Sequence, residues 1–240
     1  SSDILDYAVG GDEGDTVYAV LELDSSCTEV GWYFENRDEW GNFALVKSDD
    51  GGVTWSDITE NVMGASSLPD LIVEPDSSAN VSLDLVASAP DDQDWVAVAG
   101  YYVDDTANTV PFVVASEDGG SNFTYAHPVE DSSAGTAMSM MMDMAVSPEV
   151  GNIHNIALAG VADLVYPGAN ASGLGTVFRL EAGTWLTGGW VDTRGYPGWN
   201  DSTDAIDDWA FATEGVVAVD FSPNFDLDDT IVCMSVGDFT

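Results

Sequence analysis

Carboxylates are the side chains of this chain most able to do chemistry, because 43 of its 240 residues are Asp or Glu. Two short loops crowd them together: 226–230 reads DLDDT and 91–94 reads DDQD. Ca²⁺ binds hard oxygen ligands of this kind, although neither loop has the spacing or the terminal Glu of an EF-hand. The sequence therefore predicts either Ca²⁺ sites or plain solvated turns at Asp226, Asp228, Asp229, Asp91, Asp92 and Asp94.

A pair of carboxylates at a suitable separation is also what a glycoside hydrolase needs. Candidate acids stand just before predicted strands, at Asp15, Asp94 and Asp229. Acids that recur at equivalent turns are more typical of architecture or ion binding, since a catalytic pair does not repeat from one unit to the next. We therefore single out no catalytic residue, and an enzyme acting on neutral glycans stays an alternative.

Two aromatic stretches are candidates for stacking on sugars or docking a protein partner. They are 31–43, GWYFENRDEWGNF, and 187–204, TGGWVDTRGYPGWNDSTD. The side chains concerned are Trp32, Tyr33, Trp40, Trp190, Tyr196 and Trp199. The alternation of inward and outward residues in a long hairpin explains both stretches as well, with the rings in the core.

Other metal chemistry is disfavoured. His127 and His154 are isolated from each other and from the cysteines, which argues against Zn²⁺. The run 138–144, MSMMMDM, predicts a core strand with every second Met on its inner face, namely Met138, Met140, Met142 and Met144.

The net charge of −39, with only four basic residues, limits the partners. Nucleic acid needs Lys and Arg against its phosphates, and anionic membranes also attract basic segments, so both are disfavoured. No apolar stretch reaches the 18 residues of a membrane-spanning helix, which excludes membrane insertion by a helix. Self-repulsion of this size requires screening by salt or neutralisation by divalent ions, so we expect an environment of high salt, bound Ca²⁺ or both, with Ca²⁺ as the candidate cofactor. An acidic surface that only maintains solubility is the alternative.

The elements that position these acids are predicted to be strands. Short β-rich runs alternate with Gly, Asp, Ser and Pro clusters, and no helical period is sustained, which favours an all-β fold. Four stretches, beginning at Asp6, Asp84, Asp143 and Val219, each contain a strand, a turn and a second strand. Their spacing of roughly 60 to 80 residues is longer than that of the common propeller repeats.

Two octets follow strands of these repeats: SDDGGVTW at 48–55 and SEDGGSNF at 116–123. Each predicts a tight hairpin turn, because Asp caps backbone N–H groups, Gly adopts positive φ and the aromatic ring packs beneath. The pattern residues are Ser48, Asp50, Gly52, Thr54, Trp55, Ser116, Asp118, Gly120 and Phe123, and an eroded third copy keeps Gly183 and Trp185. No Gly-Lys-Ser/Thr follows, so these are not phosphate loops.

The octets resemble the Asp-box, also called the bacterial neuraminidase repeat. The resemblance implies one β-propeller over 1–240, in which each box is a structural turn between the third and fourth strands of a blade. It implies blades at about 1–75, 76–135 and 136–210 and a partial blade at 211–240. A propeller hides its edge strands by closing. We therefore expect a fragment of a larger ring, or a four-blade ring whose termini share one blade.

Proteins of this kind include sialidases, xyloglucan-cleaving glycosidases, receptors, assembly factors and surface-layer proteins, and the fold does not choose among them. The Arg-Ile-Pro motif of sialidases is absent, and the three arginines stand at unrelated positions. The negative field would also repel an anionic sugar. A sialidase is therefore disfavoured.

The address is predicted to be extracellular or cell-surface, from the sequons and the near absence of lysine. The sequon at Asn122 lies inside the second octet, so Asn170, Asn200 and Asn80 are the expected glycosylation sites. Cys27 and Cys233 either form a disulfide across a long loop or remain small buried residues.

The function favoured by these observations is a structural or interaction protein of the cell surface, such as a surface-layer or filament subunit. Its expected partners are further copies of itself or other surface proteins, and glycans are a further candidate. The alternatives are a glycoside hydrolase on neutral glycans or a glycan-binding module using the Trp-rich stretches. A soluble assembly factor or a receptor ectodomain also stays open.

Overall fold

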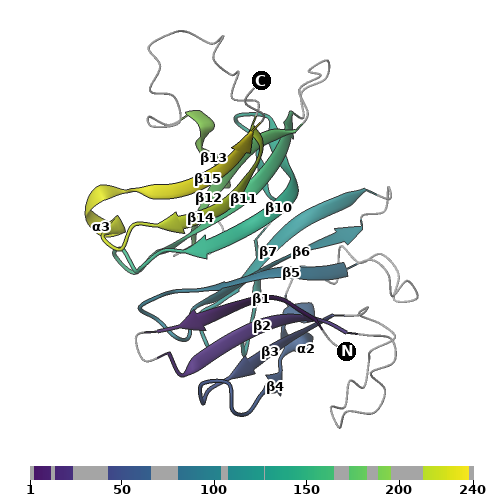
Figure 1. The fold of residues 1–240 in the computed structure, drawn as a ribbon, viewed down its shortest axis with the longest axis vertical. Helices are drawn as coiled ribbons and strands as arrows, with labels where there is room; N and C mark the ends of the chain where they lie inside the picture. Colours follow the sequence, from purple (N-terminus) through teal and green to yellow (C-terminus); the bar gives the residue numbers. More distant parts are fainter. Residues whose placement is uncertain are drawn as a thin grey trace. The chain divides into compact units, whose positions relative to one another are not determined.

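The computed structural model describes residues 3–11, 14–23, 43–65, 81–103, 108–126, 128–164, 173–182, 189–195 and 213–237. The chain divides into two compact units, Ser1–Pro128 and Val129–Thr240, each of which has its own apolar core. Strands make up most of both units (Figure 1). Among the described residues, no helix is long and apolar enough to cross a membrane.

The first unit contains two four-stranded antiparallel sheets in which neighbouring strands follow one another along the chain. One sheet consists of β1 (Asp3–Gly10), β2 (Thr16–Glu22), β3 (Phe43–Ser48) and β4 (Ser56–Asp57), followed by the short helix α2 (Thr59–Met63). The other consists of β5 (Val81–Ser88), β6 (Val96–Val103), β7 (Thr109–Ser116) and β8 (Thr124–Ala126). Both are simple meanders, as the alternation of strands and turn residues predicts.

The two sheets of the first unit pack face to face around one core. Tyr18, Val20 and Leu45 of the first sheet belong to the same buried cluster as Val98 and Phe112 of the second. Burying a side chain of this size stabilises the fold by about 1.5–3 kcal/mol. A meander sheet packed on the next meander sheet is the arrangement of neighbouring blades in a β-propeller.

The second unit repeats this plan with one sheet enlarged and the other reduced. Its five-stranded sheet contains β9 (Glu130–Asp131), β10 (Thr136–Val146), β11 (His154–Leu164), β12 (Leu174–Ala182) and β13 (Val191–Asp192). A 3₁₀ turn, η1 (Thr193–Gly195), follows. The remaining pair is β14 (Thr213–Phe221) and β15 (Ile231–Gly237), with α3 (Phe225–Asp228) between them.

Small and aromatic residues form the core of the second unit. Ala157, Ala159 and Val177 of the larger sheet pack with Phe221 and Phe225 of the smaller one. The two Phe rings meet edge to face, with their centroids 4.7 Å apart. The all-β fold with propeller-type blades, predicted from the sequence, is confirmed. One boundary differs, because β9 lies in the range expected for the second blade but pairs with β10.

In the methionine run, 138–144, buried and exposed side chains do not simply alternate along the strand. Met138, Met141 and Met144 are buried, whereas Met140 and Met142 are 48% and 41% exposed. The register of β10 against β11 shifts between Met138 and Met140 and again between Met141 and Asp143. Each bulge inserts one residue and so reverses which face the following side chains occupy. The prediction that every second Met faces the core is therefore wrong for Met140 and Met142.

The first strands of neighbouring sheets are joined by a carboxylate in both units. Asp6 Oδ1 accepts the N–H of Tyr7 at 2.8 Å, and its Oδ2 accepts the N–H of Val86 on β5 at 2.9 Å. Asp143 does the same in the second unit, with the N–H of Met144 at 2.9 Å and that of Val219 on β14 at 2.8 Å. Burial raises the pKa of Asp143, although these two N–H bonds oppose the rise. Each unit is thus a pair of sheets that share one carboxylate.

Candidate functional site

The first octet forms a closed network of hydrogen bonds after β3. Asp50 Oδ1 accepts the N–H of Thr54 at 2.7 Å and the hydroxyl of Ser48 at 2.8 Å, while Oδ2 accepts the hydroxyl of Thr54 at 2.6 Å. Ser48 Oγ in turn accepts the N–H of Gly52 at 2.8 Å. Gly52 has φ of 89°, which other residues rarely adopt. The indole of Trp55 donates to the Gly52 carbonyl at 3.0 Å and covers the turn.

The second octet repeats this geometry after β7. Asp118 Oδ1 accepts the N–H of Asn122 and the hydroxyl of Ser116, both at 2.8 Å. Its Oδ2 accepts the Asn122 amide at 2.6 Å, so Asn replaces Thr without loss of the bond. Gly120 has φ of 83° and donates its N–H to Ser116 Oγ at 2.9 Å. The ring of Phe123 is buried.

The acids that precede the second strands act here through their backbone. The N–H of Gly51 donates to the carbonyl of Asp15, and that of Gly119 donates to the carbonyl of Asp94, each at 2.8 Å. Each octet is thereby tied to the turn before its neighbouring strand. These bonds use backbone carbonyls, which any residue supplies, so they account for the turn geometry and not for the acidic side chains at these positions.

The hydrogen bonds keep the octet carboxylates ionised. The Thr54 hydroxyl and N–H, followed by the Ser48 hydroxyl, lower the pKa of Asp50 to about 2. Burial opposes the same effect at Asp118, but the Asn122 and Ser116 bonds still hold its pKa below the usual range. A carboxylate that has lost its proton throughout the neutral range cannot act as a general acid.

A buried carboxylate network lies at one end of the large sheet in the second unit. Asp192 accepts the hydroxyl of Thr176 on β12 at 2.7 Å and that of Thr136 on β10 at 3.0 Å. Arg194 pairs with the same carboxylate, with Nε 2.9 Å from Oδ2. The N–H of Asp192 donates to Asp131 Oδ2 at 3.0 Å, so the carboxylates connect β9, β10, β12 and β13.

Sequence patterns did not reveal this network, because its members are far apart along the chain. Asp131 is 61 residues from Asp192, and it also caps the turn at Ser133 and Ala134 through Oδ1. Burial opposes ionisation, but hydrogen bonds, chiefly from Ser133 and from Arg194 respectively, lower the pKa values of Asp131 and Asp192. The network therefore consists of permanently charged groups and suits cross-linking of strands better than proton transfer.

The three described basic residues are all engaged within the fold. Lys47 lies 2.8 Å from Asp49 and 5.7 Å from the centre of the Tyr18 ring. Arg179 donates to Asn155 at 2.9 Å and stacks over Phe225, and Arg194 is held by Asp192. No cluster of arginines that could bind a sugar carboxylate occurs among these described residues, and Arg37 lies outside them.

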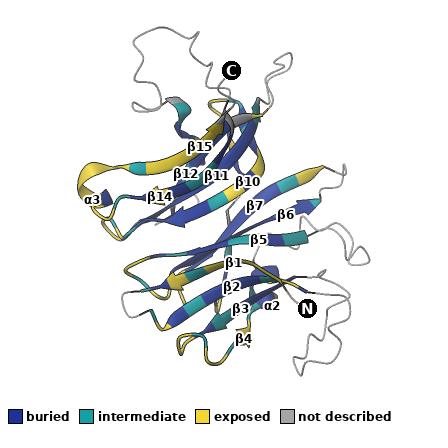
Figure 2. Ribbon diagram, viewed as in Figure 1, coloured by how far each residue is buried: buried dark blue, intermediate teal, exposed yellow. Residues whose placement is uncertain are grey.

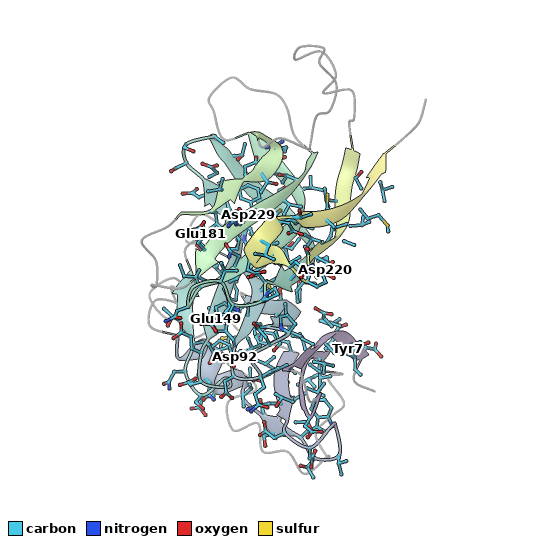
Figure 3. The ribbon with its side chains drawn as sticks, turned by 90° about the vertical axis from the view of Figure 1, so that its left-hand side faces the viewer. Tyr7, Asp92, Glu149, Glu181, Asp220 and Asp229 are labelled. Atoms are coloured by element: carbon cyan, nitrogen blue, oxygen red, sulfur yellow. The ribbon has the colours of Figure 1, made fainter. Side chains whose placement is uncertain are left out.

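The acidic loops are ordered by contacts within the turns. Asp228 accepts the Ser222 hydroxyl at 2.7 Å and the Thr230 N–H at 3.0 Å, which lower its pKa. Asp92 accepts the N–H of Asp94 at 2.9 Å. Figure 3 labels Asp92 and Asp229 in these two loops. Within the described ranges, no group of three or more His, Cys, Asp or Glu side chains is placed to hold a metal ion. Ca²⁺ binding by the loops stays a prediction.

The aromatic candidates divide between one that the structure describes and five that lie outside the described residues. Trp190 is 4% exposed, so it belongs to the core and is not a surface platform as we had allowed. Its indole nitrogen and Nη1 of Arg194 are buried without a hydrogen-bond partner. The other candidates, Trp32, Tyr33, Trp40, Tyr196 and Trp199, lie outside the described residues, as do Gly183 and Trp185 of the eroded octet.

Cys233 is exposed on β15 and has no disulfide partner among the described residues. The expectation that Cys233 is a small buried residue is therefore wrong, whereas its disulfide with Cys27 stays a prediction. Its outward exposure follows from the position of β15, where the side chains from Val232 to Val236 are exposed. Cys27 lies outside the described residues, as do the sequons at Asn80, Asn170 and Asn200.

No protein-family model matches the sequence, and no curated protein matches it. Among solved structures, the chain is similar to a Hadza microbial sialidase, at 16% identity, 78% coverage of this chain, 32% of that chain and a TM-score of 0.38. It is similar to an ancestral enzyme of glycoside hydrolase family 74, at 16% identity, 94% and 23% coverage and a TM-score of 0.44. A family-93 α-L-arabinofuranosidase of Fusarium graminearum gives 12% identity, 79% and 66% coverage and a TM-score of 0.29. The chain spans about a third or less of the first two proteins. Because these TM-scores lie below 0.5, function is argued from the chain's own residues.

Proposed function

We propose that this protein is a structural or interaction protein of the extracellular surface, built on an Asp-box β-propeller. In this proposal it acts as a subunit of a surface layer or filament, and its partners are other copies of itself or neighbouring surface proteins.

The proposal rests on one observation: the described carboxylates named below bind other groups within the fold. Asp50 and Asp118 hold turns, Asp6 joins neighbouring strands, and Asp131 and Asp192 cross-link one end of a sheet. These groups stabilise the fold, and hydrogen bonds lower the pKa values of Asp50, Asp118, Asp131 and Asp192. The whole chain, these groups included, has a formal net charge of −39, and we infer that it presents a strongly acidic surface.

Such a surface requires cations before copies can approach one another. At physiological ionic strength the screening length is about 8 Å, which leaves much of the repulsion between two close surfaces. Ca²⁺ bridges carboxylates of different chains at low affinity, at a Kd on the order of 10⁻⁴–10⁻³ M in extracellular modules. We therefore propose assembly that depends on Ca²⁺, on high salt or on both.

Size-exclusion chromatography with light scattering tests this proposal. The protein is run in about 10 mM CaCl₂, a concentration well above that Kd range, then in EDTA, each at low and at molar NaCl. At low NaCl we expect large species in Ca²⁺ that return to monomer in EDTA; large species that persist in EDTA at molar NaCl would assign the assembly to salt. A monomer under all four conditions would contradict the proposal.

One observation favours a second candidate, a hydrolase of neutral glycans. Asp84 on β5 is half-buried, and burial raises its pKa, which suits a general acid. Release of reducing ends from neutral polysaccharides, abolished in Asp84→Asn but retained in Asp92→Asn, would replace the structural proposal with this one.

A further inference from the structure

In each unit, one strand exposes apolar side chains on the side that faces away from the other described sheet of that unit. In the second unit, Val232, Met234 and Val236 on β15 are 60%, 63% and 50% exposed. In the first unit, Ile4, Tyr7 and Val9 on β1 are 65%, 66% and 48% exposed. Figure 2 shows exposed stretches along both strands. Apolar side chains gathered in this way mark an interaction surface more often than isolated ones do.

Strand register shows that these side chains share one face in each case. Met234 is opposite Ala218 and Val232 is opposite Asp220, whereas Val219 and Phe221 point the other way into the core. This set, Ala218, Asp220, Val232, Met234 and Val236, is called the β15 face.

On the first sheet, Ile4, Tyr7 and Val9 are opposite Leu21, Ala19 and Val17. Asp6 and Ala8 point instead toward the second sheet. The exposed set Ile4, Tyr7 and Val9 is called the β1 face; Ala19, which is 3% exposed, and Leu21 belong to a neighbouring buried cluster with Ala44 and Val46. Figure 3 labels Tyr7 and Asp220, one from each face.

We infer that the β15 face of one copy packs against the β1 face of a second copy. This inference rests on the self-association in the proposed function and names the surfaces that carry it. The contact would repeat a packing that occurs twice within the chain, where the first two strands of one sheet pack on the first strand of the next. A second copy already has a sheet face of the complementary kind, and it is therefore the partner in this inference.

Backbone N–H groups of the first strands already have acceptors within the chain, which is compatible with a second copy as the partner. The N–H of Tyr7 on β1 is already satisfied by its own Asp6, as that of Met144 on β10 is by Asp143. The N–H of Tyr7 therefore needs no carboxylate from a face that packs on β1. The β15 face carries Asp220, whose Oδ1 accepts the N–H of Phe221 at 2.8 Å, the local bond that Asp6 and Asp143 also make.

The distribution of charge along the chain also favours contact between two copies at these faces. The segment 231–237, IVCMSVG, has no charged residue in a chain with a formal net charge of −39. On β1, Asp6 points away from the β1 face toward Val86. Two strongly acidic copies approach at lower cost where the faces are mainly apolar, and salt or Ca²⁺ must screen the exposed Asp220 of the β15 face as well as the other acids. Because the two faces differ, the contact is heterologous and joins copies head to tail, in an open row or a closed ring.

Cysteine cross-linking between two differently labelled copies tests the contact. Both copies carry Cys27→Ser and Cys233→Ser; one also carries Tyr7→Cys and the other Val232→Cys. They are mixed under the conditions in which the unmodified protein assembles, and a short bismaleimide is added. We expect a cross-linked dimer containing both labels, and none when Val53→Cys, 79% exposed on the first octet, replaces Tyr7→Cys.

The outcomes separate this inference from the proposed function. If the unmodified protein assembles but the two copies do not cross-link, only the inference fails. Cross-links between two Val232→Cys copies, or within one chain that carries both cysteines, also overturn it. If the unmodified protein never assembles, the proposed function fails and this contact fails with it.

A charge placed on the face gives an independent measurement. Met234→Glu is expected to lower the association constant about tenfold or more, since each factor of ten corresponds to about 1.4 kcal/mol. Leu227→Glu is the matched control, because Leu227 is 83% exposed in α3 and lies outside the β15 face. Equal assembly of the two variants would overturn the inference.

Discussion

The two units hold their hairpins with carboxylates in opposite environments. In the first unit, Asp50 and Asp118 lie at exposed turns, and each bonds to residues within four positions of itself. In the second unit, Asp131 and Asp192 are buried and are bonded to each other's strand across 61 residues. The first arrangement is local and repeated, whereas the second is long-range and occurs at one place among the described residues.

This difference separates two ways of using an acid in a very acidic protein. An exposed carboxylate that accepts several N–H and O–H groups needs no counter-ion, because water solvates the rest of it. A buried carboxylate needs a compensating cation as well as hydrogen bonds, and here Arg194 supplies it. We therefore expect the second unit to be far more sensitive to loss of a single acid.

The largest expected effect is that of Asp192→Ala. The change leaves the Arg194 guanidinium buried without its carboxylate and removes the acceptor of two Thr hydroxyls. Breaking a buried pair in this way costs about 3–5 kcal/mol of unfolding free energy. Urea unfolding measures the loss, and hydrogen exchange should place it in β10–β12. Glu181→Ala, which removes the exposed partner of Arg179, is the control and should cost less than about 1 kcal/mol. Similar losses in the two variants would remove the contrast between buried and exposed acids.

The next effect should be equal in the two units. Gly100 on β6 and Gly160 on β11 face the bulges of β5 and β10, where a Cβ would collide with the carbonyl oxygens of Ser82 and Met140. Alanine at either position should destabilise its unit by about 1–3 kcal/mol, because backbone must move. Gly189→Ala, where a Cβ meets nothing within 4 Å, is the control. If only one of the two substitutions lowers the midpoint temperature of thermal unfolding, the two bulges are not equivalent.

A smaller and again paired effect is expected in the octets. Ser48→Ala and Ser116→Ala each remove a buried hydroxyl that accepts a Gly N–H and donates to the octet Asp. The expected loss is about 1 kcal/mol for each. Urea midpoints of the two variants should agree, while Val53→Ala in the same turn should leave the midpoint unchanged. Clearly unequal midpoints would contradict the view that the two turns are energetic copies.

The smallest expected effect is a pH dependence that differs in sign between two carboxylates, Asp50 of the first unit and Asp143 of the second. The pKa of Asp50 is about 2 in the fold, against about 3.9 in an unfolded chain. Its contribution to stability is therefore full above pH of about 4 and is lost as the pH falls toward 2. Asp143 has a raised pKa, so its contribution instead declines as the pH rises above about 4.

Hydrogen exchange of β1–β3, followed from pH of about 5 to 2 in molar salt, measures the first of these effects. Asp50→Asn should flatten the profile in β1–β3 and leave that of β10–β12 unchanged. An unaltered profile in the variant would assign the acid sensitivity to other carboxylates.

The sequence predicted much of the fold because the signals that specify it are local. Strand runs, turn residues and the two octets act within a few positions, and the second strands begin at or close to the expected residues. The prediction for the methionine run was wrong, since no residue in its sequence indicates the bulges that turn Met140 and Met142 outward. The burial of Trp190 was equally hidden, because it depends on which strands surround β13.

By itself, the sequence determined the all-β class, the turn chemistry around Asp50 and Asp118, and the acidity that limits the partners of this protein. These properties follow from composition and from hydrogen bonds between near neighbours. Only the tertiary structure decided that Asp131, Asp192 and Arg194 meet, that Asp6 and Asp143 each join two sheets, and that β1 and β15 leave apolar faces exposed. Such contacts join residues separated by about one repeat. Their physical cause is the packing of whole sheets, which no short stretch of the chain encodes.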